Sequence, residues 1–368
     1  MKQPLLFINV TRQCNINCPR CYLTIEQRTR KECIPFEYID KALSDPFFLG
    51  DDIEPIIAWE GGELTLVGQH VLRDYMQRVR DKFPKVRQTM VTNAYNTPNW
   101  LIDLCREYMD NHFEVTYSMG HKYTLDGSSE KYQERFLRSI QKARKAGMSV
   151  TVNVELNKET FEAGAGALVE IMRKSDAKIW EFDASVQFDK FLESPLYNHM
   201  MYPVLPLSIN YDQFSSYLIE LVDKYGHELQ EMGIQSSILW HSQTQAKSQF
   251  FNVKNSDMMF TLNPDGTVVT DVLWCDMGAM ILGNIKDQKI SDFMDHPIRR
   301  KHSRWENKLR CKSCVNCEYY HSCQGGPSHV PVYDGVTNEC AGAKKLYQFM
   351  EKYKGPYDSE NQMFDPVK

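Results

Sequence analysis

The first half of the chain alternates between short apolar runs and amphipathic stretches, and this alternation limits the fold more than any other feature. Apolar or β-branched runs of strand length lie at 5–10, 55–59, 87–92, 113–118, 149–154 and 178–182. Apolar residues at helical spacing predict helices near 35–43, 68–82, 99–110, 130–146 and 165–174. Strands that alternate with helices are typical of parallel βαβ units, in either an open sheet or a barrel.

Polar residues and glycines stand where these predicted strands end. Cys14, Gly61, Asn93, Ser118 and Asn153 lie at, just beyond or close to such ends. Because the carboxyl ends of parallel strands meet at one edge of a sheet, these residues should gather on one face. The sequence therefore predicts a functional site at that face.

Three cysteines follow the first predicted strand at positions i, i+4 and i+7: Cys14, Cys18 and Cys21. This spacing is expected to bring three thiolates around one point, as a metal ion or an iron–sulfur cluster requires. A [4Fe–4S] cluster has four irons that each normally take one cysteine, so three cysteines leave one iron open. An open coordination position is the usual mark of a catalytic site.

Together with Gly61-Gly62-Glu63 after the second strand, the Cys-x3-Cys-x2-Cys motif resembles the radical S-adenosylmethionine (SAM) superfamily. The resemblance implies an α/β fold built on a partial (β/α)6 TIM-like barrel. It implies that Cys14, Cys18 and Cys21 hold a [4Fe–4S] cluster whose fourth iron is chelated by SAM. Reductive cleavage of SAM would then give a 5′-deoxyadenosyl radical that abstracts a hydrogen atom from the substrate.

The same resemblance implies a SAM pocket. Glycines let the backbone approach closely, and the carboxylate of Glu63 would pair with the SAM ammonium group. Asn93, Ser118 and Asn153 resemble positions that contact the ribose and carboxylate of SAM. For each of these three, the alternative is a polar residue that bonds to nearby backbone.

One position departs from the family pattern. The residue before the third cysteine is usually aromatic and packs against adenine, whereas here it is Arg20 and the aromatic residue, Tyr22, comes after. We expect Tyr22 to contact adenine. Arg135 is either a partner of the SAM carboxylate or an exposed residue of its helix.

The alternation ends near residue 185, and a second group of cysteines follows. An Asn-Pro-Asp-Gly turn between two short strands near 258–270 predicts a hairpin. Six of the eleven cysteines lie between 275 and 340. Four of them could form a structural zinc site: Cys314, Cys317, Cys323 and Cys340. The hairpin and the Cys-x2-Cys-x5-Cys-x-Gly-Gly motif also resemble the SPASM/twitch extension of radical SAM enzymes, which carries auxiliary [4Fe–4S] clusters.

This second resemblance implies two domains, a radical SAM partial barrel at 1–235 and a SPASM/twitch-like domain at 236–368. Only one set of four cluster ligands is complete, which predicts a single auxiliary cluster; whether Cys275 and Cys311 join it stays open. Asp276 resembles a catalytic base of the sulfatase-maturing branch, with an exposed loop aspartate as the alternative. The basic run 298–304 is either a solvated helix face or a contact for an acidic substrate or redox partner.

Composition limits the classes of partner that the protein is expected to bind. The net charge of −5 does not favour binding to nucleic acid. No apolar run reaches the length of a bilayer span, and none resembles a signal peptide. We therefore expect a cytoplasmic protein without a membrane or nucleic-acid partner. The resemblance implies a flavodoxin- or ferredoxin-type electron donor. It also implies oxidation, crosslinking or epimerisation of a peptide or of a small-molecule natural product.

The choice of substrate stays open at this point. Cys14 lies so near the first residue that no leader-binding domain is expected before it. This favours a small molecule, as in sugar or aminocyclitol dehydrogenases and epimerases, or a peptide delivered by a separate binding partner. The non-enzymatic alternative is a zinc-binding interaction module. It would explain the cysteines but not Gly61-Gly62-Glu63 at a strand end or the strand–helix alternation.

Overall fold

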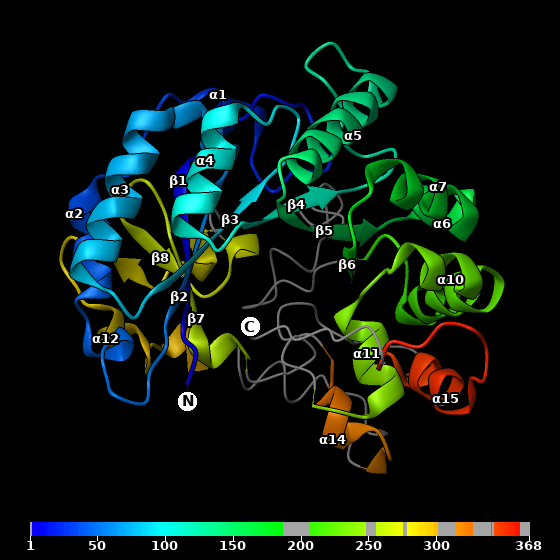
Figure 1. Cartoon of the computed structure of the whole chain (residues 1–368). Coiled ribbons are helices and arrows are strands. Elements are labelled where there is room, and N and C mark those ends of the chain that lie inside the picture. Colours follow the sequence, from blue (N-terminus) through cyan, green and yellow to red (C-terminus); the bar gives the residue numbers. More distant parts are fainter. Residues whose placement is uncertain are drawn as a thin grey trace.

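One sheet of nine strands organises the part of the chain that the structure describes, in the order β6-β5-β4-β3-β2-β1-β7-β8-β9 (Figure 1). The structure is a computed structural model that describes residues 2–186, 207–247, 255–274, 278–300, 314, 316–326, 340 and 342–360. Within these ranges, no helix combines the length and the apolar character needed to cross a bilayer.

Six parallel strands form the first part of the sheet. They are β1 (Leu5–Thr11), β2 (Ile56–Gly61), β3 (Arg87–Thr92), β4 (His112–Tyr117), β5 (Ser149–Leu156) and β6 (Ile179–Ala184). Each strand pairs with the one before it in the sequence. With right-handed crossovers, this order places the connecting helices on one face, so the sheet winds in one sense as in a barrel. The predicted α/β partial barrel is confirmed.

The helices between these strands lie on the outside of the curved sheet (Figure 1). They are α1 (Ile25–Thr29), α2 (Phe36–Leu43), α3 (Gln69–Lys82), α4 (Asn99–Tyr108), α5 (Ser129–Lys145), α6 (Lys158–Ala163) and α7 (Ala165–Ser175). The core lies between the two layers. Trp59 is fully buried there, and its Nε1 donates to Gln88 Oε1 (2.9 Å), while Gln88 Nε2 donates to the carbonyl of Met76 in α3 (3.1 Å).

Alternate residues of a strand face opposite sides of a sheet, so the neighbours of these core residues face the inside of the curve. Alternating burial along the strands follows this rule, with the apolar side chains on the helix side. Polar side chains of the inner face include Asn9, Glu60, Glu114, Asn153 and Glu181. The inside of the partial barrel is therefore a polar surface.

Helices after β6 form a layer with the C-terminal helix, and the first of them also packs against α7 of the outer layer. These helices are α10 (Tyr211–Met232), α11 (Ser237–Thr244) and α15 (Lys344–Lys352), and α15 packs against the other two (Figure 1). Tyr353 Oη donates to the carbonyl of Val222 (3.1 Å), and Tyr357 Oη donates to the carbonyl of Ile234 (3.1 Å). The short helix α14 (Tyr320–Cys323) joins this layer.

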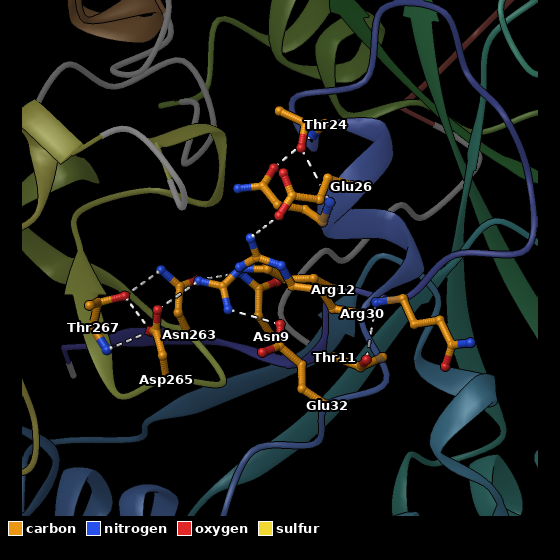
Figure 2. Close-up of polar contacts among 12 residues, drawn as sticks. Asn9, Thr11, Arg12, Thr24, Glu26, Arg30, Glu32, Asn263, Asp265 and Thr267 are labelled. Atoms are coloured by element: carbon orange, nitrogen blue, oxygen red, sulfur yellow. Dashed lines mark hydrogen bonds and ion pairs between the residues drawn. The ribbon is translucent and has the colours of Figure 1, made fainter.

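The predicted hairpin is confirmed and extends the sheet on the other side of β1. Its strands are β7 (Met259–Leu262) and β8 (Thr267–Val269), followed by β9 (Gly283–Asn284), with α12 (Ile290–Phe293) after them. Asn9 Nδ2 donates to Asn263 Oδ1 (2.8 Å), and Arg12 bonds to Glu32 (3.0 Å) and to Asp265 (3.1 Å) (Figure 2). The sheet thus runs across the predicted domain boundary at 235/236, which stays a prediction.

Candidate cofactor site

The cysteine loop begins directly after β1 and is held by hydrogen bonds on two sides. The amide of Cys14 donates to the carbonyl of Arg28 in α1 (3.0 Å), and the amide of Asn17 donates to the carbonyl of Tyr123 after β4 (2.8 Å). The buried Arg28 side chain donates through Nη1 to the carbonyl of Cys18 (3.3 Å). The loop is therefore fixed at the carboxyl edge of the parallel strands, where the sequence placed it.

Gly61 and Gly62 lie against the backbone that leads into this loop. The amide of Gly62 donates to the carbonyl of Thr11 (2.9 Å). A Cβ on Gly61 would lie 2.2 Å from Thr11 O, and a Cβ on Gly62 would lie 2.3 Å from Arg12 O. Gly61 also has a φ of +146°, which L-residues rarely adopt. Glycine is therefore needed here because the two residues contact the backbone segment that leads to Cys14. A contact of either glycine with SAM stays a prediction.

Glu63 joins the ends of β2 and β3. Its buried carboxylate accepts hydrogen bonds from Thr65 N (3.1 Å), from Thr65 Oγ1 (2.7 Å), from Thr92 Oγ1 (2.9 Å) and from Asn93 N (3.0 Å). A carboxylate has about four lone-pair positions, so these donors occupy most of them. Glu63 can therefore act on a nearby ammonium mainly through its charge.

Asn93 connects this network to the first cysteine. Its Nδ2 lies 3.8 Å from Cys14 Sγ and donates to Asn15 Oδ1 (2.9 Å). Its Oδ1 accepts from Tyr95 N (2.9 Å), and its carbonyl accepts from the buried Tyr132 Oη (2.7 Å). The structure thus brings Cys14, the glycine–glutamate segment and Asn93 together, as the sequence predicted.

Ser118 and Asn153 belong to separate hydrogen-bond networks. The buried Ser118 hydroxyl accepts from Asn157 Nδ2 (2.9 Å), and Asn157 caps α6 by accepting from Thr160 N (2.7 Å). Asn153 lies inside β5, and its Nδ2 donates to Glu114 Oε2 on the inner face (2.9 Å). These partners are side chains distant in the sequence, not the nearby backbone groups of the alternative interpretation, and the contact of Ser118 and Asn153 with SAM stays a prediction.

Arg20, the departure from the family pattern, has a structural partner. Its guanidinium bonds to His121 Nε2 (2.6 Å) and pairs with Glu159 (3.3 Å), which also pairs with His121 (2.9 Å). These contacts tie the cysteine loop to the loop after β4 and to α6. Tyr22 is half-buried, and its contact with adenine stays a prediction.

Arg135 is an exposed residue of α5. Its guanidinium lies over the Tyr95 ring, 4.7 Å from the ring centroid. Together with Asn15, these two residues line an open pocket between α5 and the cysteine loop. The helical arginine is thus held by a cation–π contact next to the site.

The three thiols share a buried environment that suits a cluster. Burial raises the pKa of Cys14 to about 11 and that of Cys21 to about 12, and the charge of Cys18 adds to both shifts. The positive charges of Lys122 and Arg28 act in the opposite direction on Cys18. Thiolates that repel one another in a buried site are stabilised by bound metal. The residues therefore fit a cationic iron centre.

The spacing of the thiols differs from the expectation of a single point. In the part of the chain that the structure describes, no three His, Cys, Asp or Glu side chains stand close enough to hold one metal ion. An iron–sulfur cluster is bound differently, because each cysteine takes a separate iron of a larger body. The three thiols need only surround such a cluster.

The cysteines of the second group, which we call the second cysteine field, also lie near one another: Cys314, Cys317, Cys323 and Cys340. Burial raises the pKa of Cys323 to about 12, and the charges of Cys340 and Cys314 contribute. A Cβ on Gly342 would lie 2.8 Å from Cys323 Sγ and 3.9 Å from Cys340 Sγ, so glycine leaves the space that these thiols need. The amide of Cys317 donates to the carbonyl of Cys314 (3.2 Å). These residues fit a bound cluster, in which each thiol takes a separate iron.

Several predicted residues lie outside the described ranges: Cys275, Asp276 and Cys311. The basic run 298–304 is described only at its start. There Arg299 is buried, with its guanidinium 4.2 Å from the centroid of the Phe260 ring, whereas Arg300 is exposed and pairs with Asp295. A wholly solvated helix face is therefore wrong for Arg299.

Solved structures of other proteins share the fold of this chain. No family model matches the sequence. The structure of native anSMEcpe with bound AdoMet (SAM) and Cp18Cys peptide matches with a TM-score of 0.69 and 16% identity, over 95% of this chain and 96% of that chain. Native anSMEcpe with bound AdoMet matches with a TM-score of 0.66 and 17% identity, over 94% and 95% of the two chains.

A third structure agrees. Streptococcus suis SuiB bound to precursor peptide SuiA matches with a TM-score of 0.61 and 13% identity, over 92% of this chain and 76% of that chain. The chain has the radical SAM fold. Within the radical SAM fold, the cysteine loop and the ends of β2 and β3 form the candidate cofactor site.

The radical SAM fold brings residues to this site that sequence reasoning missed. Lys122 is buried in the loop after β4, donates to Thr116 Oγ1 and acts electrostatically on Cys14 and Cys18. A lone loop lysine carries no sequence signal. Glu60 could have been found, because it alternates with the core residue Trp59 and must face inward.

Proposed function

We propose that the chain is a radical SAM enzyme in which Cys14, Cys18 and Cys21 hold a [4Fe–4S] cluster. The observation that carries the proposal is the position of the cysteine loop. It is docked by Gly61 and Gly62 at the carboxyl edge of a sequentially wound parallel sheet. Active sites of (β/α) barrels lie at this edge.

Different residues of the chain would bind different groups of the cofactors. When bound, the reduced cluster would supply the electron that cleaves SAM to methionine and an adenosyl radical. Lys122 offers a buried cation for the SAM carboxylate, and Glu63, whose charge also acts on Cys14, would serve the ammonium group. Asn93 fixes the position of Cys14 through its amide, so the loop keeps one geometry.

A peptide is the favoured substrate, oxidised, crosslinked or epimerised at a C–H bond. Two of the similar structures hold peptides, Cp18Cys in one and the precursor peptide SuiA in the other. The polar inner face of the sheet, with Glu60, Glu114 and Glu181, offers hydrogen-bonding groups for such a chain. The alternative of a small sugar or aminocyclitol lacks this support.

We also propose one auxiliary [4Fe–4S] cluster, held by Cys314, Cys317, Cys323 and Cys340. Four cysteine ligands would close this cluster, which suits transfer of an electron from the substrate rather than substrate binding. A flavodoxin- or ferredoxin-type protein would reduce the first cluster. The space that Gly342 leaves beside two of the thiols supports the ligand set.

The test is anaerobic purification followed by metal analysis and a SAM cleavage assay. We expect brown protein with about eight irons per chain and 5′-deoxyadenosine after reduction with dithionite. Cys18→Ala should lose about four irons and all cleavage, whereas Cys33→Ala, an exposed cysteine outside both groups, should lose neither. Colourless, zinc-loaded protein without cleavage would contradict the proposal, and about twelve irons would contradict the single auxiliary cluster.

A further inference from the structure

Three glutamates face the inside of the partial barrel from alternate strands. Glu60 lies in β2, Glu114 in β4 and Glu181 in β6. Their neighbours along the chain, Trp59 and Trp180 among them, are fully buried on the helix side, so the glutamates point the other way. The inner face therefore concentrates carboxyl groups.

Two of these glutamates have partners in the protein. Glu114 accepts from Asn153 Nδ2 (2.9 Å) and from Thr89 Oγ1 (3.3 Å). Glu181 accepts from the amide of Ser237 at the start of α11 (3.0 Å) and from the Ser237 hydroxyl (2.5 Å). These contacts explain both side chains as parts of the fold.

Glu60 differs from the other two. It is only 8% exposed, and its Oε1 is buried without a hydrogen-bond partner among the described residues. An unpartnered buried carboxylate oxygen loses its hydration without a replacement, which costs stability. Such a group in a native structure requires an explanation, and an absent ligand that donates to it is one.

Asn9 presents a second acceptor beside Glu60. The two residues are direct register partners on the neighbouring strands β1 and β2. Asn263 Nδ2 donates to Thr267 Oγ1 (3.0 Å), so its Oδ1 accepts from Asn9 Nδ2 (2.8 Å) (Figure 2). This orientation leaves Asn9 Oδ1 facing away from Asn263, buried and unpaired within the described ranges. Two neighbouring acceptor oxygens that have no donor among the described residues favour a ligand that donates to both.

The charge around Glu60 favours a cation as that ligand. Burial and the charges of Asp271 and Glu114 raise the pKa of Glu60 well above its usual range. A ligand with positive charge and several N–H donors would reverse this effect and satisfy both oxygens. An ammonium or guanidinium group has both properties.

We propose that Glu60 and Asn9 bind an ammonium or guanidinium group of the substrate inside the barrel. The inference rests on the proposed function and specifies its substrate class, a peptide with a basic side chain or a small amine. SAM also carries an ammonium group, and it is the other source of this chemistry. Glu63, three residues further along the chain at the cysteine loop, is the carboxylate nearer to the expected place of SAM.

The first experiment titrates a probe cation into the anaerobic, SAM-loaded holoenzyme by calorimetry. The probe is n-butylammonium, and n-butanol is its neutral counterpart. We expect saturable binding of n-butylammonium that is at least roughly tenfold weaker in Glu60→Gln, retained in Glu60→Asp, and unchanged in Glu130→Gln on the exposed side of α5. Equal binding by wild type and Glu60→Gln would overturn the proposal, as would equal binding of n-butanol and n-butylammonium.

The second measurement separates the two sources of the cation. The dissociation constant of SAM is determined for wild type and Glu60→Gln at matched iron content. An affinity for SAM that changes less than roughly twofold assigns the cation to the substrate, whereas a roughly tenfold loss assigns it to SAM and overturns the proposal. A wild-type protein that does not cleave SAM contradicts the proposed function instead, because the n-butylammonium titration does not require cleavage.

Discussion

Gly62 and Gly342 have the same role at the two cysteine fields, because each leaves a space that a single methyl group would fill. At Gly62 the neighbouring atom is the carbonyl oxygen of Arg12, 2.3 Å from the position of a Cβ. At Gly342 it is Cys323 Sγ at 2.8 Å. Such contacts force movement, and at Gly62 the atom that must move belongs to the backbone before Cys14.

We expect Gly62→Ala to displace the cysteine loop and Gly342→Ala to displace the Cys323 thiol. Each variant should lose the iron of its own field, about four of eight atoms, and Gly62→Ala should also lose SAM cleavage. Iron analysis and the cleavage assay measure both effects. Gly278→Ala is the matched control, since no atom of the described residues lies within 4 Å of its Cβ position and it does not need a positive φ. Full iron in Gly62→Ala would show that the loop tolerates the methyl group.

Lys122 gives a second prediction at this scale. It is 8% exposed, and its charge acts on two of the three thiols. We expect Lys122→Met to weaken SAM binding roughly tenfold, about 1.4 kcal/mol, because a charge-assisted bond to the carboxylate is lost. The dissociation constant of SAM measures this, with the exposed Lys174→Met as control. Equal affinity in both variants would remove Lys122 from the site.

The sequence located Cys14, Glu63 and Asn93 because strand ends set their positions, and the structure brings all three together. The contacts of Lys122 and Arg20 could not be read in the same way. Each depends on a loop whose path is set by tertiary packing rather than by local pattern. Arg20 has its partners, His121 and Glu159, about a hundred residues or more away.

At the scale of elements, Glu181 joins β6 to the start of α11. Its carboxylate accepts from the amide of Ser237, the first residue of the helix. Burial raises the pKa of Glu181 to about 8, with the hydrogen bonds from Ser237 opposing the shift and the charges of Asp183 and Glu114 adding to it. The folded protein therefore holds a proton at Glu181 at pH values where the unfolded chain has lost it.

This proton predicts a pH dependence of stability. Because the pKa is higher in the folded state, the contribution of Glu181 is fully favourable below its unfolded pKa, near 4.5, and is lost as the pH rises to about 8. The slope is at most about 1.4 kcal/mol per pH unit for one proton. Glu181→Gln should lack this loss, so its melting temperature relative to wild type should rise between pH 5 and pH 8. A constant difference between the two proteins over that range would contradict the prediction.

The elements themselves were predicted well where their pattern is long. The strand run at 87–92 and the helix at 68–82 agree with β3 and α3 within one residue. The helices α6 and α11 were missed, because six or eight residues do not establish a helical period. In α11 the apolar residues Ile238, Leu239 and Trp240 are consecutive, which hides the amphipathic spacing.

At the scale of the whole molecule, the sequence left open whether the sheet is open or a barrel. Periodicity describes single strands, whereas the winding of the sheet depends on which strands pair. The order β1 to β6 without reversal settles this point. The pairing of β7 with β1 could not be expected either, since about 250 residues separate Leu5 from its register partner Met259.

The hairpin also changes what lies at the border of the sheet. Because β7 pairs along Leu5–Ile8, β1 is an interior strand, and the outermost strand on that side is β9, which has only two residues. A shortened chain that ended near residue 250 would leave the backbone donors and acceptors of β1 open beside an apolar run. We expect such a fragment to self-associate, visible as light scattering that grows with concentration, while the full chain stays monodisperse. The hairpin would then protect the protein against aggregation, whatever else it contributes.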